Sequence, residues 1–186
     1  MARRRVSPGL AVMDLDIAPA SDGDYGVACN LARFYFYDMA EHAGWPFPEN
    51  GLFDIGDHFA PYWGKPAAKS AWPVAWRGFA FVVRVDGHPA GFALVQQHGE
   101  MQFDMGEFFI GRQYRRNAVG RRVATAMFDR FAGHWQVREM PTNVAAQAFW
   151  RKIIADYTGS AFTETQAVFP EYGSKEFVVQ RFKSAA

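Results

Sequence analysis

The sequence is poor in cysteine, has no excess of one charge and contains no long apolar run. Its single cysteine, Cys29, leaves no partner for an intramolecular disulfide, which fits a reducing compartment. The 20 Lys and Arg residues balance 19 Asp and Glu residues, so no overall field attracts nucleic acid or an anionic membrane. No stretch reaches the roughly 18 apolar residues of a membrane-spanning helix. We therefore expect a soluble cytoplasmic protein that binds neither nucleic acid nor membranes.

Patterns typical of metal sites and hydrolases are also missing. The five histidines show no HExxH or similar ligand spacing, and one cysteine cannot build a zinc site of the usual kind. No serine lies in the glycine pattern of a nucleophile elbow. The sequence thus predicts no metal and gives no support to a hydrolase triad.

The composition is that of a packed globular protein. Apolar residues make up 49% of the chain and aromatic residues 17%, and the length suits one domain. We expect residues 1–186 to form that domain, with residues 1–9 flexible. Three arginines near the start resemble a signal peptide, but Pro8 and Gly9 break the apolar run that such a peptide needs.

Hydrophobic spacing and turn residues predict the elements of the first half. We expect a strand after Leu10, a turn with N-cap residues at Ser21 and Asp22, and a helix over 24–44. Prolines interrupt residues 46–77 and leave room only for short helical turns.

The middle of the chain is rich in predicted strands. Residues 78–98 read as two antiparallel strands joined by a tight turn at Asp86-Gly87, because both positions tolerate positive φ. A third strand starts near Met101, and its Gly106 indicates a bulge or a close backbone approach.

The rest of the chain alternates helices and strands. A helix from Val119 should end near Gly133, followed by a short strand over 134–140 and a helix over 144–157 that Asn143 caps. Two antiparallel strands should finish the chain. This order predicts an α/β protein of the α+β kind, with a mixed, mostly antiparallel central sheet flanked by helices.

An arginine-rich turn leads into the helix at Val119. The segment "GRQYRRNAVGRR", residues 111–122, holds five arginines in twelve positions. Free N–H groups and the dipole at a helix start attract anions, and Gly120 removes a Cβ that would block an approaching oxygen. Guanidinium donors would surround such an anion: Arg115, Arg116, Arg121 and Arg122. The alternative is a solvated basic face or a nucleic-acid patch, and the segment matches neither a P-loop nor a dinucleotide fingerprint.

The segment "YRRNAVG" resembles the cofactor loop of the GNAT acetyltransferase superfamily. That loop reads Gln or Arg, two free positions, Gly, one free position, then Gly or Ala, and here it starts at Arg115 and ends at Gly120. Ala118 stands where the family has its first glycine. If that position needs a left-handed backbone, alanine costs about 1–2 kcal/mol.

Two more segments extend the resemblance over most of residues 10–182. "NVAAQAFWRK" resembles the family helix that follows the fifth strand, with Trp150 in place of its tyrosine, and "EFFI" resembles the strand along the pantetheine arm. The resemblance implies the GNAT fold and acetyl-CoA as cosubstrate. It implies these cofactor-binding residues: Phe109, Ile110, Arg115, Arg116, Asn117, Ala118, Val119, Gly120, Arg121, Asn143, Phe149 and Trp150.

Several of these residues have two interpretations. The resemblance implies that the Ile110 N–H polarises the thioester carbonyl. Asn143 would bind the pantetheine arm, cap its helix, or do both. Trp150 would pack against the cofactor or the core, since an indole cannot serve as the acid that the family tyrosine is proposed to be.

Acetyl transfer to an amine needs a base more than an acid. An alkylammonium with a pKa near 10.4 is deprotonated in only about one molecule in 10³ to 10⁴ at pH 7, whereas a thiol with a pKa of about 8.5 leaves readily as thiolate. Glu107 is the candidate base, directly or through water, with Asp104 in reserve. Tyr157 is the substitute acid, or else an aromatic residue that faces the core.

The acceptor is not encoded in any motif. Aromatic residues of the first helix and the proline-rich region would lie in the core or, as the resemblance implies, line an acceptor pocket. Such a pocket would take a small-molecule amine with an apolar body, although a protein amine also fits, and the protein would be a monomer or homodimer. The aromatic residues are Phe34, Tyr35, Phe36, Tyr37, Phe53, Phe59, Tyr62, Trp63, Trp72 and Trp76. Two alternatives remain: a non-catalytic acyl-CoA-binding or regulatory module, and a nucleic-acid-binding protein, which the near-zero net charge disfavours.

Overall fold

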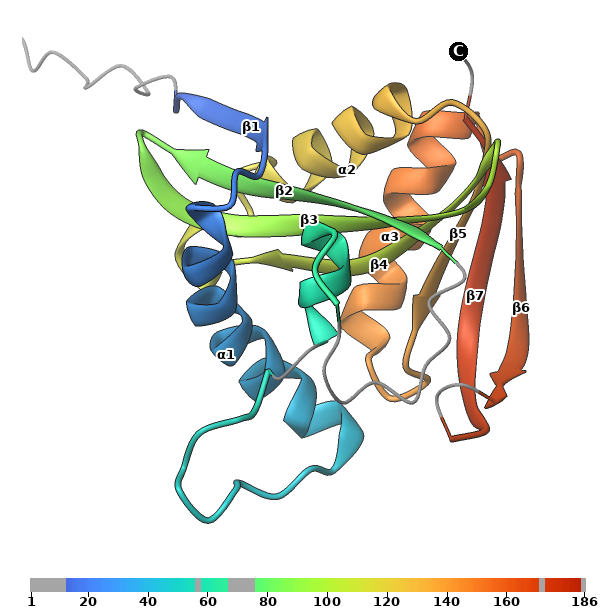
Figure 1. The fold of residues 1–186 in the computed structure, drawn as a ribbon. Helices are drawn as coiled ribbons and strands as arrows, with labels where there is room; N and C mark the ends of the chain where they lie inside the picture. Colours follow the sequence, from blue (N-terminus) through green and yellow to red (C-terminus); the bar gives the residue numbers. More distant parts are fainter. Residues whose placement is uncertain (1–12, 56–57, 67–75, 171–172, 185–186) are drawn as a thin grey trace, which may run out of the picture.

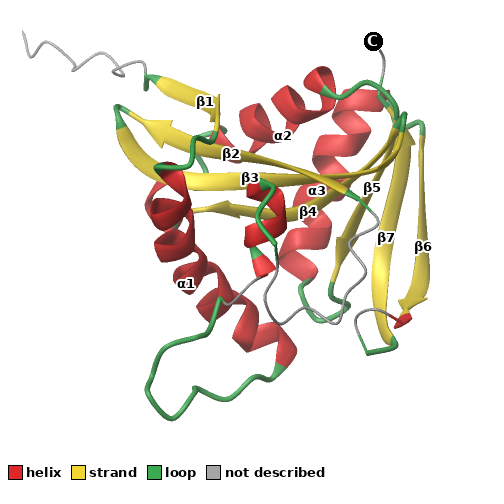
Figure 2. Ribbon diagram, viewed as in Figure 1, coloured by secondary structure: helices red, strands yellow, loops and turns green. Residues whose placement is uncertain are grey.

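A computed structural model describes residues 13–55, 58–66, 76–170 and 173–184. Seven strands form one sheet in the order β1-β2-β3-β4-β5-β7-β6, flanked by three long helices (Figure 1; Figure 2). The elements are β1 (Leu15–Pro19), α1 (Asp24–Ala43), η2 (Ala60–Trp63), β2 (Arg77–Val85), β3 (His88–Gly99), β4 (Gln102–Ile110), η3 (Arg112–Tyr114), α2 (Val119–Arg130), β5 (His134–Glu139), α3 (Val144–Thr158), β6 (Phe162–Phe169) and β7 (Lys175–Lys183).

The sheet is mixed and mostly antiparallel, which confirms the predicted fold class. Only β4 and β5 pair in parallel. The predicted hairpin is also confirmed, because Asp86 and Gly87 both have positive φ, 50° and 77°, between Val85 and its partner His88. The predicted flexible residues 1–9 lie outside the described residues. Among the described helices, none is long and apolar enough to cross a membrane.

One helix cap and one helix end differ from the prediction. Gly23 stands at the N-cap of α1 and gives no side-chain cap; instead the carboxylate of Asp24 accepts hydrogen bonds from Ser21 N and Oγ, at 2.9 and 2.6 Å. Helix α2 ends at Arg130, before the predicted Gly133. The Phe131 carbonyl accepts the indole N–H of Trp135 on β5 at 2.8 Å, which fixes the chain after the helix.

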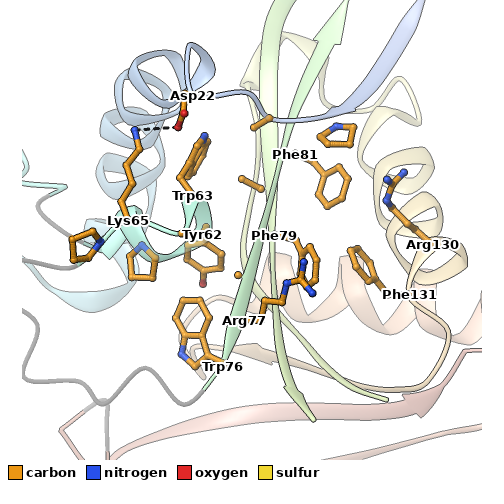
Figure 3. A pocket seen from close by; sticks show the side chains of 17 residues that line it. Asp22, Tyr62, Trp63, Lys65, Trp76, Arg77, Phe79, Phe81, Arg130 and Phe131 are labelled. Carbon is orange, nitrogen blue, oxygen red and sulfur yellow. Dashed lines mark ion pairs between the residues drawn. The ribbon is translucent and has the colours of Figure 1, made fainter. Parts of the chain in front are cut away.

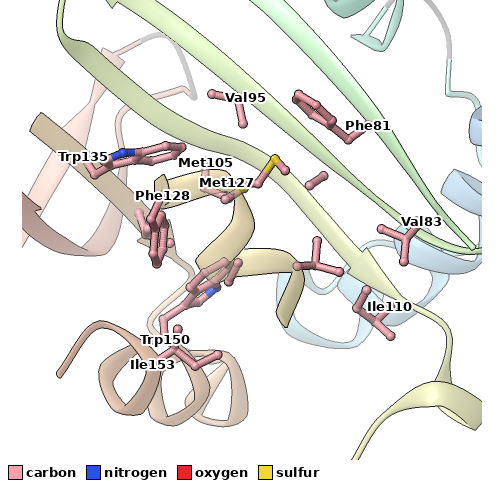
Figure 4. Close-up of a cluster of buried hydrophobic side chains, with 14 of the residues drawn as sticks. Phe81, Val83, Val95, Met105, Ile110, Met127, Phe128, Trp135, Trp150 and Ile153 are labelled. Atoms are coloured by element: carbon pink, nitrogen blue, oxygen red, sulfur yellow. The ribbon is translucent and has the colours of Figure 1, made fainter. Parts of the chain in front are cut away.

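Helices α2 and α3 cover one face of the sheet with a large aromatic core (Figure 4). Phe128 and Trp135 lie at its centre with almost no exposure, and their ring centroids are 5.1 Å apart. Full burial of one such side chain stabilises the fold by about 1.5–3 kcal/mol. Because this core fixes both helices on β4 and β5, it fixes the segment that enters α2.

Helix α1 and η2 cover the opposite face with a smaller core. Phe59 and Phe92 are completely buried there and meet edge to face, with centroids 5.2 Å apart. Tyr62 and Phe109 complete the contact between η2, α1 and β4. The predicted short helical turn is thus confirmed as η2 in the otherwise irregular region.

Strand β4 has a bulge at Gly106, as the sequence predicted. Leu94 pairs with Glu107 and Val95 with Met105, so Gly106 is an extra residue. An extra residue shifts the alternation of side chains by one position. Met105 therefore packs in the α2–α3 core, whereas Glu107 faces η2 and its neighbours.

Strands β4 and β5 separate after a short paired section. Pairing runs from Gln102 opposite His134 to Asp104 opposite Gln136, while β4 continues to Ile110. Figure 1 shows the two strands diverging from this point. We call the edge of β4 over residues 105–110, where pairing with β5 has ended, the strand split.

Candidate active site

The turn before α2 has a left-handed backbone at two non-glycine positions. Arg116 has φ 66° and Ala118 has φ 59°. The first hydrogen bond of the helix runs from Arg122 N to the Ala118 carbonyl, at 3.0 Å. The N–H groups of Val119, Gly120 and Arg121 precede this bond and so are free for an external acceptor. The conformation is the one suspected from the motif, and alanine therefore bears the cost of a left-handed residue.

The arginines of this turn divide into two groups. Arg112 and Arg115 both donate to the carboxylate of Asp38 on α1, at 2.7 and 2.6 Å, and Arg115 Nε donates to the Ile110 carbonyl at 2.7 Å. Arg115 thus joins β4, α1 and the turn, and its side chain is already engaged. Arg121 pairs with Asp156 of α3. Of the five arginines of this turn, Arg116 and Arg122 form no ion pair within the described residues.

Gly120 has a packing role that the sequence did not predict. A Cβ on Gly120 would lie 3.1 Å from two ring atoms of Phe149 on α3, and 3.8 Å from Cγ1 of Ile110. Its missing side chain therefore permits close packing of α2 on α3. This packing accounts for a glycine here independently of an anion, and the contact of Gly120 with an anion stays a prediction.

The backbone of Ile110 faces the strand split. Gly111 N donates to the Ala90 carbonyl on the β3 side, at 2.8 Å. Because successive residues of a strand direct their backbone groups to opposite edges, those of Ile110 point away from β3. Its carbonyl accepts Arg115 Nε, which fits this direction. The Ile110 N–H is thus directed into the strand split.

Glu107 forms a short contact with a histidine from the η2 region. His58 Nε2 lies 2.6 Å from Glu107 Oε1, and the side chains are 39% and 12% exposed. Burial lowers the pKa of His58, but its hydrogen bond to Glu107 and the charge of Glu107 raise the pKa above the usual value. Phe36 of α1 lies edge-on to the imidazole, 6.0 Å between centroids. A largely buried carboxylate next to the strand split is therefore paired with a histidine that packs against an aromatic ring.

A tyrosine hydroxyl presses on the bulge next to Glu107. A Cβ on Gly106 would lie 2.1 Å from the hydroxyl oxygen of Tyr62, so only glycine fits without movement. The same hydroxyl accepts a hydrogen bond from Gln96 Nε2 of β3 at 2.7 Å. Tyr62, which is 4% exposed, therefore holds the bulge that directs Glu107 toward His58.

Asp104, the reserve base, is enclosed in an ion pair. Its carboxylate is 2.9 Å from both Arg138 and Gln136 of β5, and the residue is 1% exposed. Burial raises its pKa, against the opposing effects of Arg138 and Gln136. Since the carboxylate joins β4 to β5 where the strands still pair, it closes the base of the strand split and is not accessible to an acceptor.

Tyr157 is bound at the C-terminal end of α2, whereas the arginine turn enters the N-terminal end of that helix. Its hydroxyl donates to Asp129 at 2.8 Å, and burial together with this carboxylate raises its pKa to about 12. It lies eight residues beyond Phe149 on α3, about 12 Å along a helix with a rise of 1.5 Å per residue. The structure therefore does not bring Tyr157 together with Glu107 and the turn.

The remaining predicted residues lie on α3 and at the end of β4. Asn143 Oδ1 accepts from Ala146 N at 3.1 Å, which confirms the helix cap. Trp150 is 6% exposed and lies in the aromatic core, 4.9 Å from the Phe108 ring. Phe109 is buried on the opposite face, beside the guanidinium of Arg115. Trp72, predicted for the acceptor pocket, lies outside the described residues.

Sequence reasoning missed His58 and the role of Tyr62. Their partners lie far along the chain, at a separation of 49 residues for the pair with Glu107 and 34 for the pair with Gln96. The available signal was a cluster of aromatic and histidine residues in a proline-rich region, which no motif connects to a strand. Within the described residues, no three His, Cys, Asp or Glu side chains gather as metal ligands.

The sequence matches the model of the Acetyltransferase (GNAT) family over residues 37–154. This match spans β4, the arginine turn, α2, β5 and most of α3. The chain belongs to the GNAT acetyltransferase family. No curated protein matches the sequence.

Solved structures share the fold at low sequence identity. The ribosomal-protein-S18-alanine N-acetyltransferase from Escherichia coli is 15% identical with a TM-score of 0.57, over 93% of this chain and 96% of that one. A GNAT-family acetyltransferase from Staphylococcus aureus is 8% identical with a TM-score of 0.61, over 92% and 100%. Nourseothricin acetyltransferase is 15% identical with a TM-score of 0.56, over 92% and 99%. These likenesses establish the fold alone.

Proposed function

We propose that the protein transfers an acetyl group from acetyl-CoA to an amine by direct attack within a ternary complex. The observation that carries this proposal is the junction of three features at one end of β4. These are the outward-facing Ile110 N–H, the left-handed turn into α2, and the Glu107–His58 pair on the adjoining face. An acyl carbonyl, an anion and an amine would each find a suitable group there.

The residues of the strand split and the turn fit acetyl-CoA. The free N–H groups at the start of α2, with Arg116 and Arg122, would hold the diphosphate, because a helix N-terminus and guanidinium donors both favour negative charge. The edge of β4 would lie along the pantetheine arm, with Asn143 at the start of α3 nearby. When bound, acetyl-CoA supplies an acetyl group activated as a thioester. The Ile110 N–H would donate to its carbonyl oxygen.

Glu107 would take the proton of the acceptor ammonium, directly or through one water. At pH 7 an alkylamine is almost entirely protonated, and forming the nucleophilic free amine costs roughly 4–5 kcal/mol. A base close to the amine therefore speeds the reaction. His58 fixes one carboxylate oxygen of Glu107 at 2.6 Å and leaves the second for the proton. Since His58 is partly exposed, it also gives the pair contact with solvent.

The transfer needs no dedicated acid in this chain. A thiol with a pKa of about 8.5 leaves as thiolate at modest cost. Trp150, which replaces the tyrosine of the family motif, lies in the core and has no acidic group to offer. The Tyr157 hydroxyl already donates to Asp129. We therefore leave Tyr157 out of the proposed site.

Aromatic rings near Glu107 favour an amine with an apolar body. Phe36 lies beside His58, and stacks on the half-exposed Trp45 with centroids 6.0 Å apart. When an apolar acceptor covers this surface, each Å² of apolar area removed from water strengthens binding by about 25 cal/mol. A small molecule of this kind is the proposed acceptor, and a protein amine with neighbouring apolar side chains is the second candidate.

Calorimetric titration with acetyl-CoA, followed by thiol release across a panel of amines, tests the proposal. We expect micromolar binding, and a 3- to 10-fold weaker affinity in Arg116→Gln. Arg130→Gln, at the other end of α2, makes the same change of charge and should leave the affinity unchanged. Binding without thiol release for any amine would favour the non-catalytic module, and absence of binding would overturn the proposal.

A further inference from the structure

A groove lies along the exposed edge of β2, away from the strand split (Figure 3). Its volume is about 1190 Å³. Strand β1 ends at Pro19 opposite Phe81, so the four residues Arg77 to Ala80 have no strand beside them in the described part of the chain. The Ala20 N–H still donates to the Ala80 carbonyl at 2.8 Å, which closes one end of the groove.

The floor of the groove presents backbone groups that are ready to pair. Ala80 directs its carbonyl toward the β1 side, and alternate residues of a strand point their backbone groups to the same edge. Gly78 therefore presents its N–H and C=O to the groove, and in the described residues neither has a hydrogen-bond partner. An unpaired strand edge is a template for an added strand.

Aromatic side chains form both walls. Trp63 and Trp76 lie on the η2 side, while Phe79 and Phe131 lie on the α2 side, with 4.9 Å between the two phenyl centroids. A Cβ on Gly78 would be 2.5 Å from Tyr62 Cα, so the η2 wall rests directly on the floor. The η2 wall is therefore fixed against β2 at Gly78.

Two arginines stand on the α2 side without an acidic partner. The Arg77 guanidinium carbon lies 4.8 Å from the Phe79 ring centroid, and that of Arg130 lies 5.2 Å from the Phe81 centroid. In the described part of the chain neither arginine forms an ion pair. The nearby Lys65 is already paired with Asp22 at 3.4 Å. The α2 wall therefore carries two uncompensated positive charges.

We propose that this groove binds an extended acidic peptide segment of another protein, added as a strand to the edge of β2. Backbone hydrogen bonds to Gly78 would supply the register, and the arginines would supply the preference for carboxylates. Phe79 and Phe81 are two residues apart, so the cations above them are separated by about 7 Å along the strand. Acidic side chains at positions i and i+2 of the peptide match this spacing.

The alternation of side chains along a strand also determines which peptide residues face the η2 wall. Residues between the two acids point to the opposite wall, where Trp63 and Trp76 offer apolar contact. The recognised pattern is therefore acidic, apolar, acidic. A lone acidic ligand would use the arginines but not the strand edge, and this difference can be measured.

A fluorescein-labelled peptide, Glu-Val-Glu-Val-Glu, tests the proposal by fluorescence anisotropy against the full chain. We expect a dissociation constant in the range of tens of micromolar. The double variant Arg77→Gln/Arg130→Gln should bind the peptide at least tenfold more weakly. A Lys-Val-Lys-Val-Lys peptide should not bind. Arg116→Gln should bind the acidic peptide as the unmodified chain does, which separates this groove from the proposed acetyl-CoA site.

A peptide with methylated backbone nitrogens distinguishes strand addition from charge attraction. Strand addition predicts loss of binding on methylation, and slower hydrogen exchange at the Gly78 amide when the unmethylated peptide is bound. Equal binding of the methylated peptide, unchanged exchange at Gly78, or equal binding of the lysine peptide would each overturn the proposal. Both arginines are exposed, so their variants should melt within about 2 °C of the parent chain.

Discussion

Two glutamates on the diverging strands show how the environment decides what a carboxylate can do. Glu107 on β4 is 12% exposed and is bonded to His58. Glu139 on β5 is 4% exposed, and in the described residues neither of its oxygens has a hydrogen-bond partner. Burial, reinforced by the charge of Glu164, raises the pKa of Glu139 to about 8. The first glutamate is the proposed base, whereas burial without a hydrogen-bond partner favours the protonated form of the second.

The largest effect should follow from removing the carboxylate of Glu107. We expect Glu107→Gln to lower kcat at pH 7 by roughly 10² to 10³, because the ammonium of the acceptor loses its base. The loss should shrink toward pH 10, where free amine becomes abundant. Thiol release against pH measures this, with Glu139→Gln as the matched control that should keep its activity. Turnover of Glu107→Gln within twofold of the parent chain would remove Glu107 from its role.

The next effect concerns the bulge that turns Glu107 away from the aromatic core. Gly106→Ala places a methyl group 2.1 Å from the Tyr62 hydroxyl, and we expect a loss of about 2–4 kcal/mol in the free energy of unfolding. Tyr62→Phe removes that oxygen, so the double variant should lose less than the sum of the single variants. Urea denaturation of all four chains measures the coupling. Additive losses would show that the bulge and the tyrosine are independent.

A smaller effect of opposite sign is expected at Glu139. The unfolded chain releases this proton near pH 4.5, whereas the folded chain holds it until about pH 8, so stability falls as pH rises between these values. Glu139→Gln should therefore unfold like the parent chain near pH 4, and be more stable by on the order of 1–3 kcal/mol at pH 8.5. Thermal melts across pH check this.

Glu164 provides the control for that experiment. Its hydrogen bond to Arg151 lowers its pKa, so its charge stabilises the fold above the pKa of the unfolded chain and the effect is lost as pH falls. Glu164→Gln should therefore destabilise the protein at neutral pH. Equal responses of the two variants would contradict the contrast between a paired and an unpaired carboxylate.

The smallest effect tests the turn that lies between the two strands in sequence. Ala118→Gly should raise stability by about 0.5–1 kcal/mol, because glycine adopts φ 59° without the steric cost that alanine bears. Ala126→Gly, within the same helix, should lower stability by a similar amount. A lower melting temperature for Ala118→Gly would mean that the turn is not strained.

Local chemistry was readable from the sequence, and long-range pairing was not. Asp86-Gly87 and Gly106 require particular backbone geometries, so their sequence neighbours suffice to predict a turn and a bulge. The spacing of Phe149, Trp150 and Ile153 likewise predicted the buried face of α3. His58 meets Glu107 only because η2 packs over β4, and no local rule encodes that approach.

Gly120 shows that the motif did not indicate every contact of its residues. The motif placed a glycine at the helix start, where small size was expected to serve a ligand. The ring of Phe149 packs closely against this position, so the missing side chain also serves helix packing. Arg115 is similar, since Asp38 and the Ile110 carbonyl engage the side chain that the sequence offered to an anion.

The structure of the protein with acetyl-CoA tests the account most directly. We predict that the thioester carbonyl lies within hydrogen-bond distance of the Ile110 N–H, that the diphosphate meets the first N–H groups of α2, and that the acetyl group is open to an amine beside Glu107. A ligand bound outside the strand split, or in the strand split with its acetyl group away from Glu107, would contradict the account.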